Sequence, residues 1–272
     1  MQDRQWARSR YWFCHFLHNR HERVKIQWNA APSAEQTLDD SLARPVAHWL
    51  AWISQTNAPA RQRLINWGVN DCASDPAYIQ TLRLFVKEEQ HHTALIDRYL
   101  TLRNLPVIPG GLVRAAVRSC IRPLGLRFEL SILLLSEIAV ITMNRLLLPQ
   151  VKDEILRGLL TQIIHDHQCH LAFHCERLTA EFADFNFIRR NLRRLRLRTM
   201  FATAVKGITL HHRSLLRTVG CTPRDFSNQC RSHFTAILER MVPYRREALL
   251  AQLVDQRDNP FAKAPALFGT AT

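Results

Sequence analysis

"LSILLLSEIAVITMNRLLL", residues 130–148, is almost long enough to cross a membrane, but Glu137, Asn144 and Arg145 interrupt its apolar side chains. An ionisable side chain is costly in lipid unless it faces a protein interior. We therefore interpret this stretch as a fully buried helix of a helical bundle and expect no membrane span. A helix that is apolar on nearly all sides must be surrounded by other helices, and the neighbouring sequence supplies them.

Apolar residues recur three and four positions apart through most of the chain, and the eight glycines and few alternating β-branched runs give little sign of strands. Helices are predicted over residues 38–67, 76–103, 125–148, 151–182, 186–217 and 223–240. Pro59 is expected to kink the first of them.

The predicted fold class is therefore all-α, with a four-helix bundle over residues 38–184. An irregular or short-helical N-terminal arm, residues 1–37, is expected to pack on the bundle. A helical extension that contains a basic helix follows over residues 185–257, and the tail 258–272, with Pro260 and Pro265, is expected to be loose.

The composition limits the class of protein. With 272 residues, 47% of them apolar, the chain can bury a sizeable core without disulfides. Its seven cysteines form no Cys-x-x-Cys pair, and the N-terminal 28 residues contain no clean apolar segment of the kind found in signal peptides. We expect reduced thiols and a cytoplasmic location.

Two Glu-x-x-His pairs overlap in "FVKEEQHHTALIDRYL", residues 85–100. At about 100° per residue, Glu89 and His92 lie closer to the buried face than Glu88 and His91, and His91 leans toward solvent. Taken alone, such a pair is more often part of a charged surface than a metal site.

Glu137 lies in a helix that has almost no polar face. A buried carboxylate without a partner costs several kcal/mol, so it normally finds a cation, a metal ion or a proton. A metal ion and an arginine from another helix are equally good partners for Glu137 on this evidence.

Three histidines extend an aliphatic stripe in "IIHDHQCHLAFHCERL", residues 163–178. His167, His170 and His174 are spaced three and four apart, and Asp166 lies at the edge of the stripe. A single core histidine is usually only hydrogen-bonded, but three in succession favour a metal site or a proton relay.

These motifs resemble those of the ferritin-like di-metal carboxylate proteins, whose bundle core takes a carboxylate from each of two helices and Glu-x-x-His from each of the other two. Within that superfamily the chain is most similar to the bacterial ferritin-like domain proteins and, more distantly, to di-iron oxygenases such as p-aminobenzoate N-oxygenase. The resemblance covers about residues 40–180 and is carried by "DPAYIQTLRLFVKEEQHH", "RFELSILLLSEIAVI" and "IIHDHQCHLAFH".

The resemblance implies a ligand set. It assigns the metal ligands Glu89, His92, Glu137 and His170, with His167 where the family has a glutamate. It places Asp166 as the aspartate that hydrogen-bonds a ligating histidine, with Glu88 and His174 as further candidates. On the first helix no glutamate lies between residues 35 and 88, and Asn57 is nearest to the expected position, with Trp49 as an alternative alignment.

These departures reduce the negative charge of the site. With Glu89 and Glu137 as its anions, the charge balance fits one divalent metal better than two. Iron, as one or two ions, is the expected cofactor, with manganese and zinc as alternatives. Iron held with open positions could activate dioxygen, whereas zinc or no metal would leave the protein catalytically silent.

"RRNLRRLRLR", residues 189–198, gives the predicted basic helix much of the net charge of +14. Arg189, Arg190, Arg193 and Arg194 are candidate anion-binding residues that would attract phosphate, nucleic acid, anionic lipid or an acidic partner. The competing interpretation is a solvated polar face of a helix that packs through Ile188, Leu192, Leu195 and Phe201.

Three functional hypotheses follow. The first is a ferritin-like metal-dependent oxidoreductase, of the oxygenase or oxidase type, that acts on a small-molecule substrate. The second is a catalytically inactive ferritin-like scaffold or interaction protein, and the third is an anion-binding module that uses the arginine-rich helix. A homodimer is one assembly that such a bundle could form.

Overall fold

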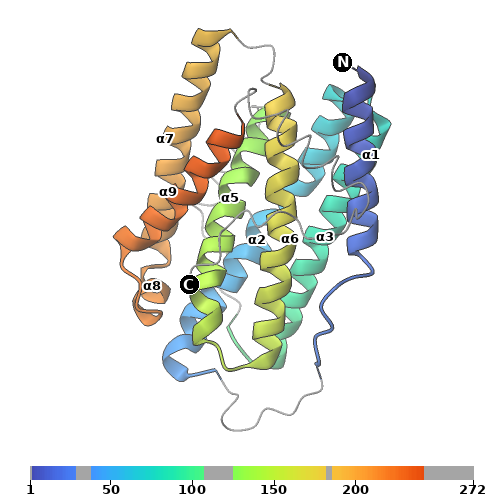
Figure 1. Cartoon of the computed structure of the whole chain (residues 1–272). Coiled ribbons are helices and arrows are strands. Elements are labelled where there is room, and N and C mark those ends of the chain that lie inside the picture. The colour runs from blue at the N-terminus through green and yellow to red at the C-terminus, as the bar shows by residue number, and fades with distance from the viewer. Residues whose placement is uncertain (1, 29–37, 107–124, 182–185, 242–272) are drawn as a thin grey trace.

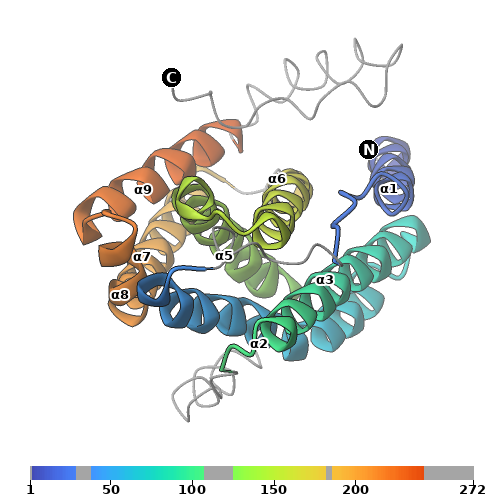
Figure 2. The same ribbon diagram turned by 90° about the horizontal axis from the view of Figure 1, so that it is seen from below.

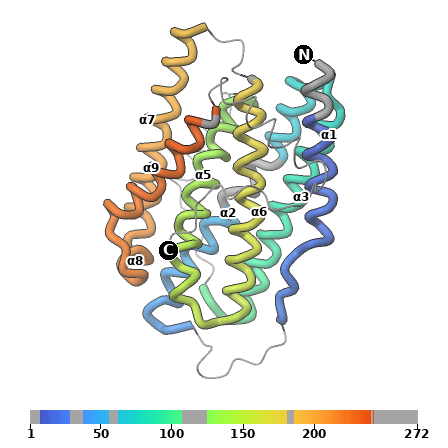
Figure 3. The backbone as a smooth tube through the Cα atoms, in the orientation of Figure 1, coloured from blue at the N-terminus to red at the C-terminus, as the bar shows by residue number. Residues whose placement is uncertain are grey.

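The computed structural model is all-α over the residues that it describes, 2–28, 38–106, 125–181 and 186–241, and no strand occurs among them. Figure 1 shows the helices, and Figure 3 follows the path of the backbone. The predicted loose tail lies outside the described residues.

Four long helices, which we call the central helices, lie side by side and share one core: α2 (Asp40–Asp71), α3 (Pro76–Leu102), α5 (Leu126–Leu147) and α6 (Glu154–Glu181). Each agrees with its predicted range to within four residues at either end. α2 pairs with α3 and α5 pairs with α6, while α2 also contacts α5 and α3 contacts α6. Residues from all four helices therefore face one another across a common interior.

Local signals explain where these helices begin. The side chain of Asp75 accepts a hydrogen bond from the backbone N–H of Tyr78, and Pro76 occupies the first turn of α3. At the start of α6, the carboxylate of Asp153 accepts hydrogen bonds from the backbone N–H groups of Ile155 and Leu156. The short 3₁₀ helix η2 (Leu148–Gln150), which contains Pro149, separates α6 from α5.

α5 is the most completely enclosed helix of the interior. Among the described helices, Leu126–Gln150 is long and apolar enough to cross a membrane, with a mean hydropathy of 1.7, and 78% of its most apolar window is buried inside the protein. Core helices share this length and composition with membrane spans. Glu137 is itself buried in the middle of α5, so its partners must come from neighbouring helices.

The N-terminal arm is more regular than expected. It forms a helix, α1 (Gln2–Asn19), which packs along α3 and buries Phe16. The hydroxyl of Ser9 donates a hydrogen bond of 2.7 Å to Asp75, which joins α1 to the first turn of α3. The last residue of α1, Asn19, is consequently held inside the protein.

On the side of the central helices away from α1 lie α7 (Phe187–His211), α8 (Arg213–Thr218) and α9 (Pro223–Arg240), as Figure 2 also shows. The prediction of a single helix over residues 186–217 is wrong in one respect, because the helix is interrupted at His212, between α7 and α8. Of the expected packing residues, Phe201 is buried as predicted, but Ile188, Leu192 and Leu195 are exposed. α7 packs through Leu197 and Val205 together with Phe201.

Candidate metal centre

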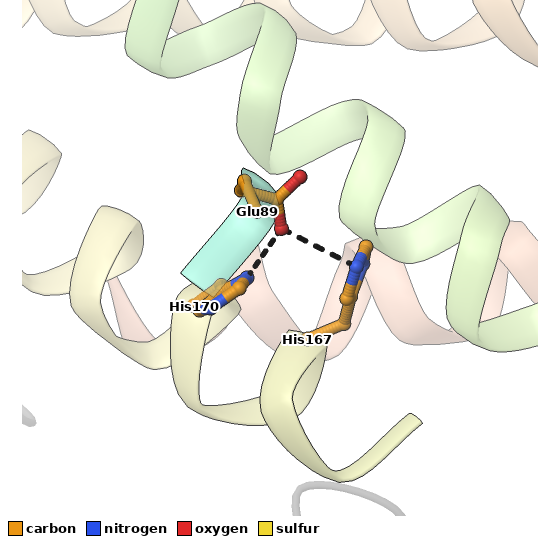
Figure 4. Close-up of side chains that lie close together, drawn as sticks. All are labelled: Glu89, His167 and His170. Carbon is orange, nitrogen blue, oxygen red and sulfur yellow. Dashed lines mark ion pairs between the residues drawn. The ribbon is translucent and has the colours of Figure 1, made fainter. Parts of the chain in front are cut away.

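The side chains of Glu89, His167 and His170 meet in the interior of the protein, between α3 and α6. One ligand atom from each of the three lies within 4.8 Å of the others, and all three residues are buried. Oε1 of Glu89 is 3.5 Å from Nε2 of His167 and 3.2 Å from Nδ1 of His170, as Figure 4 shows. The spacing of three between the histidines places both rings on the same face of α6.

Two further predicted ligands approach the same point. Nδ1 of His92 lies 3.3 Å from Oε1 of Glu89. Glu137 enters from α5, where Oε2 contacts Nδ1 of His167 and Oε1 lies 3.7 Å from Nδ1 of His170. The structure therefore brings together all five residues predicted as ligands, from three helices.

Two buried carboxylates hold the outer nitrogens of these rings. Nε2 of His170 donates a hydrogen bond of 2.8 Å to Glu88, and Nε2 of His92 donates one of 2.7 Å to Asp166. In metalloproteins, a ligating histidine commonly donates its second N–H to a carboxylate, which fixes the tautomer and orients the ring. Here the same arrangement leaves Nδ1 of each ring directed toward Glu89.

Glu88 occupies this position although the helical wheel ranked its Glu-x-x-His pair second. Both Glu88 and Glu89 are buried, because α1 covers the face of α3 on which Glu88 lies, while His91 remains half-exposed. The wheel placed His91 correctly but could not show that α1 encloses Glu88.

Asn19 is the site residue that the sequence did not reveal. Its amide donates a hydrogen bond of 2.5 Å to Glu88 and another of 2.9 Å to Asp166, so it bridges the two carboxylates that orient the histidines. Gln162 also donates a hydrogen bond of 2.7 Å to Asp166. Asn19 is an amide that belongs to no ligand motif, and only the packing of α1 against α3 brings it to the site.

The remaining candidates are placed differently. His174 is fully buried, one turn beyond His170, and its Nε2 lies 3.9 Å from Oε1 of Glu137, at the edge of the cluster. Asn57 belongs to α2, but its side chain lies outside the described residues. Trp49, the alternative alignment, is a buried core residue, and its indole N–H donates a hydrogen bond of 2.8 Å to the side-chain oxygen of Asn144.

The four candidate anion-binding arginines do not form one patch. Arg189 is exposed near the start of α7, whereas Arg193 turns toward α5 and donates a hydrogen bond of 3.2 Å to Ser131. Arg190 is half-buried, and Arg194 lines a groove between α7 and α9.

Opposite charges stabilise one another within the cluster. Burial alone would raise the pKa of Glu137, but the rings of His167 and His170 lower it to about 2. Burial would lower the pKa of His92, but Asp166 and Glu89 raise it to about 9. Glu137, Glu88 and Glu89 likewise raise the pKa of His170 well above its usual value. Protons on His92 and His170 therefore offset the charge of the buried carboxylates when no metal is bound.

His174 differs from the other histidines, because burial dominates and lowers its pKa to about 4. Its ring is neutral at physiological pH. A neutral imidazole at the edge of the cluster can bind a metal ion.

An aromatic wall separates the cluster from solvent on the side of α1. The ring of Phe85 lies 4.7 Å from the ring of His170 and 5.0 Å from that of His174, centroid to centroid, in edge-to-face contact. Phe16 of α1 stacks on His170 at 5.8 Å, and Phe173 packs against Phe16 at 5.5 Å. The wall lowers the local dielectric and so strengthens every charge interaction inside it.

The donor set fits a metal ion. Atoms bonded to one ion at about 2.1 Å lie roughly 3.0–3.4 Å from one another, and three ring nitrogens lie 3.2–3.5 Å from Oε1 of Glu89. Among the described residues, Nδ1 of His92, Nδ1 of His170 and both nitrogens of His167 make no well-directed hydrogen bond. Buried polar atoms rarely lack a hydrogen-bond partner, and a metal ion at the centre of these atoms would give each of them a partner.

No protein-family model, curated protein or solved structure matches this chain. Conclusions about its function therefore rest on the residues of the cluster.

Proposed function

We propose that this chain is a ferritin-like metal-dependent oxidoreductase, of the oxygenase or oxidase type, that uses a single iron ion. The observation that carries the proposal is the convergence of Glu89, His167 and His170 within 4.8 Å in a buried site. Two histidines and one carboxylate with open positions are the typical ligands of non-haem iron enzymes that use dioxygen.

The helix arrangement supports the ferritin-like part of the proposal. Ferritin-like bundles consist of two helix pairs joined by one long crossover connection, with metal ligands directed inward from facing helices. Here α2 pairs with α3, α5 pairs with α6, and residues 103–125 connect the two pairs. Ligands come from α3, α5 and α6, and the position proposed for α2, Asn57, has its side chain outside the described residues.

The charge of the cluster favours one ion. Glu89 and Glu137 contact the inner nitrogens of the histidines, whereas Glu88 and Asp166 accept hydrogen bonds from the outer nitrogens. Two carboxylates neutralise one divalent cation, and neutral histidines complete its coordination.

Ferrous iron bound there would supply the capacity to activate dioxygen. The residues of the chain prepare the site for it: Glu88 and Asp166 fix the orientation of His170 and His92, and Asn19 holds both carboxylates in place. Phe16 and Phe85 exclude bulk water, which protects reactive species from side reactions. His174, whose pKa is lowered to about 4, stays neutral at physiological pH and presents Nε2 at 3.9 Å from Oε1 of Glu137.

Elemental analysis tests the proposal directly. The full chain, expressed in iron-rich medium and purified without chelator, should contain close to one iron per chain, and Glu137→Ala should lose it. Glu129→Ala is a matched control, because Glu129 is also buried in α5 but pairs with Arg63 at 3.0 Å, outside the cluster. That variant should retain its iron.

A scaffold without catalytic activity is the competing hypothesis. It predicts an iron content near zero while circular dichroism shows the helices intact, and a melting temperature that chelators do not change. That pair of results would refute the proposed oxidoreductase.

A further inference from the structure

Large apolar side chains are concentrated on the outside of α7. Five of them are 61–76% exposed, whereas the large apolar residues exposed elsewhere in the described part of the chain reach only 40–45%. The five are Phe187, Ile188, Leu192, Leu195 and Leu210. Monomeric soluble proteins rarely leave such side chains together in water, so a helix that does so usually binds something.

Four of these side chains form a stripe on the outer face of α7. Ile188, Leu192 and Leu195 are spaced four and three apart, and Leu210 returns to the angular position of Leu192 five turns later. The buried residues Phe201 and Val205 lie on the opposite side of the helix. We call Ile188, Leu192, Leu195 and Leu210 the outer stripe.

Cationic side chains accompany the outer stripe. α7 contains six arginines and one lysine but no acidic residue. Arg189 and Arg196 lie along one edge of the stripe and are exposed, although the guanidinium of Arg196 also lies over the ring of Phe128, 5.0 Å from its centroid. Arg198 lies toward the other edge. The surface therefore combines an apolar centre with a positive border.

A groove of about 640 Å³ between α7 and α9 adds to this charge. Arg194, Arg198, Lys206 and Arg231 line it, and Phe201 stacks on Phe234 at its base, with ring centroids 4.2 Å apart. Glu239 also lines the groove, but within the described residues none of these four cations forms an ion pair with a carboxylate.

The positive charge of α7 argues against two possible occupants of the outer stripe, a second copy of this chain and a segment of the same chain outside the described residues. A second copy docked through the same stripe would bring the arginines of two α7 helices together, which is unfavourable. The segments outside the described residues supply little compensating charge, since residues 29–37 and 182–185 carry one acid each, residues 107–124 carry three arginines and no acid, and residues 242–272 carry four cations and three acids. The occupant should be external and anionic.

The exposed leucine and isoleucine side chains argue against nucleic acid, which binds through phosphate contacts and aromatic stacking. An anionic bilayer offers both an apolar layer and a phosphate layer. Helices with an apolar face bordered by arginine or lysine lie in the plane of such a surface, with the apolar side chains at the boundary of the acyl chains.

We propose that α7 is a lipid-binding helix that attaches this protein to the surface of an anionic membrane. The outer stripe enters the boundary between headgroups and acyl chains, while Arg189, Arg196 and Arg198 contact lipid phosphates. In Figure 1, α7 lies along one outer edge of the molecule and its first turns extend beyond α9, so a flat surface can reach them. The attachment places the metal centre close to a membrane without any helix crossing it.

Vesicle co-sedimentation of the full chain tests this proposal. The protein should sediment with vesicles of phosphatidylcholine mixed with phosphatidylglycerol, but not with vesicles of phosphatidylcholine alone. Raising the salt concentration should weaken binding, because salt screens exposed charges. Each arginine near an anionic surface contributes roughly five-fold to affinity, so Arg189→Gln and Arg196→Gln should each weaken binding by about that factor.

The triple variant Ile188→Ser, Leu192→Ser and Leu195→Ser should weaken vesicle binding by about ten-fold or more. A matched triple variant, Leu17→Ser, Val69→Ser and Leu102→Ser, removes exposed apolar side chains elsewhere and should bind as the unchanged protein does. Circular dichroism verifies that both variants keep their helices.

Several results would overturn the proposal. One is equal binding to both kinds of vesicle, and another is a stripe variant that binds as well as the matched variant. Absence of vesicle binding, together with a dimer in analytical ultracentrifugation that the stripe variant dissociates, would assign the stripe to a second copy. Salt-sensitive binding to polyglutamate without vesicle binding would assign it to an acidic protein.

Discussion

Glu88→Gln should weaken metal binding although Glu88 is not one of the expected ligands. Glu88 accepts two hydrogen bonds, one of 2.8 Å from Nε2 of His170 and one of 2.5 Å from Asn19. A glutamine of almost the same volume offers one acceptor and one donor in their place. If the donor faces His170, Nε2 must give up its proton and Nδ1 must carry it, which removes the lone pair that a metal would bind.

The size of the effect follows from the role of Glu88. Replacing the carboxylate partner of a ligating histidine typically weakens metal affinity by about 10–100-fold, equivalent to about 1.4–2.7 kcal/mol. Because Glu88 is buried and its contact with His170 is short, we expect the upper part of this range. Asn19→Ala leaves both carboxylates in place and should have a smaller effect.

The assay is an anaerobic competition titration of the purified chain with ferrous iron and a chromogenic chelator, in parallel with urea unfolding of the metal-free protein. Glu129→Gln is the matched control, since it removes the charge of another buried carboxylate, one that pairs with Arg63. Equal metal affinity in Glu88→Gln and the unchanged protein would refute the assigned role. So would an equal loss in Glu129→Gln, because the effect would then be general destabilisation.

Three further predictions concern stability. Asp153→Ala removes the cap of α6 and leaves the buried Tyr99 and the partly buried Arg103 without their carboxylate. Equilibrium urea unfolding should therefore show a loss of about 3–5 kcal/mol in the free energy of unfolding; a loss below about 1 kcal/mol would contradict this. Trp49→Phe leaves the buried oxygen of Asn144 without its donor and should cost about 1–3 kcal/mol in the same assay, whereas an unchanged free energy of unfolding would show that water replaces the indole. Burial and Arg145 lower the pKa of His233 to about 4 in the folded protein. Between about pH 4 and 6.5 the unfolded chain therefore binds more protons at this residue than the folded protein does. The free energy of unfolding should decrease as the pH falls through that window. After allowance for partial exposure, His233→Gln should reduce this acid loss by about 1 kcal/mol; identical pH profiles would exclude the effect.

The sequence predicted the central helices well, because each has a strong local signal. α3 begins where Asp75 and Pro76 form an N-terminal cap, and α9 spans residues 223–240 as predicted. The boundary between α7 and α8 was missed. His212 ends α7 without a glycine or proline, so no local signal marks the break.

Periodicity was a poor guide to α7 for a physical reason. A stripe of Ile188, Leu192 and Leu195 at helical spacing normally faces a core, yet here the opposite side of the helix packs on α5 and α9. Both faces of α7 carry apolar residues, and spacing alone cannot decide which of them is buried. The tertiary structure decides it, because Phe201 stacks on Phe234 of α9.

For the candidate site, the sequence predicted which side chains of α3, α5 and α6 converge. It did not predict how many buried carboxylates accompany them. Counting carboxylates on the expected stripes yields Glu89 and Glu137, whereas the structure buries Glu88 and Asp166 beside them. Glu88 is enclosed by a helix that is distant in the sequence, and Asn19 at the end of that helix binds both additional carboxylates.

The additional carboxylates do not create a two-metal site. A bridging carboxylate must direct its oxygens toward the ions, but Oε2 of Glu88 and Oδ2 of Asp166 each accept a hydrogen bond from the outer nitrogen of a histidine. His167 contacts both Glu89 and Glu137 through its two ring nitrogens. A glutamate there would add a fifth buried negative charge, whereas neutral histidine adds a ligand without adding charge. A histidine at this position therefore suits the proposed centre, in which two inner carboxylates balance one divalent ion and two outer carboxylates orient the rings that would bind it.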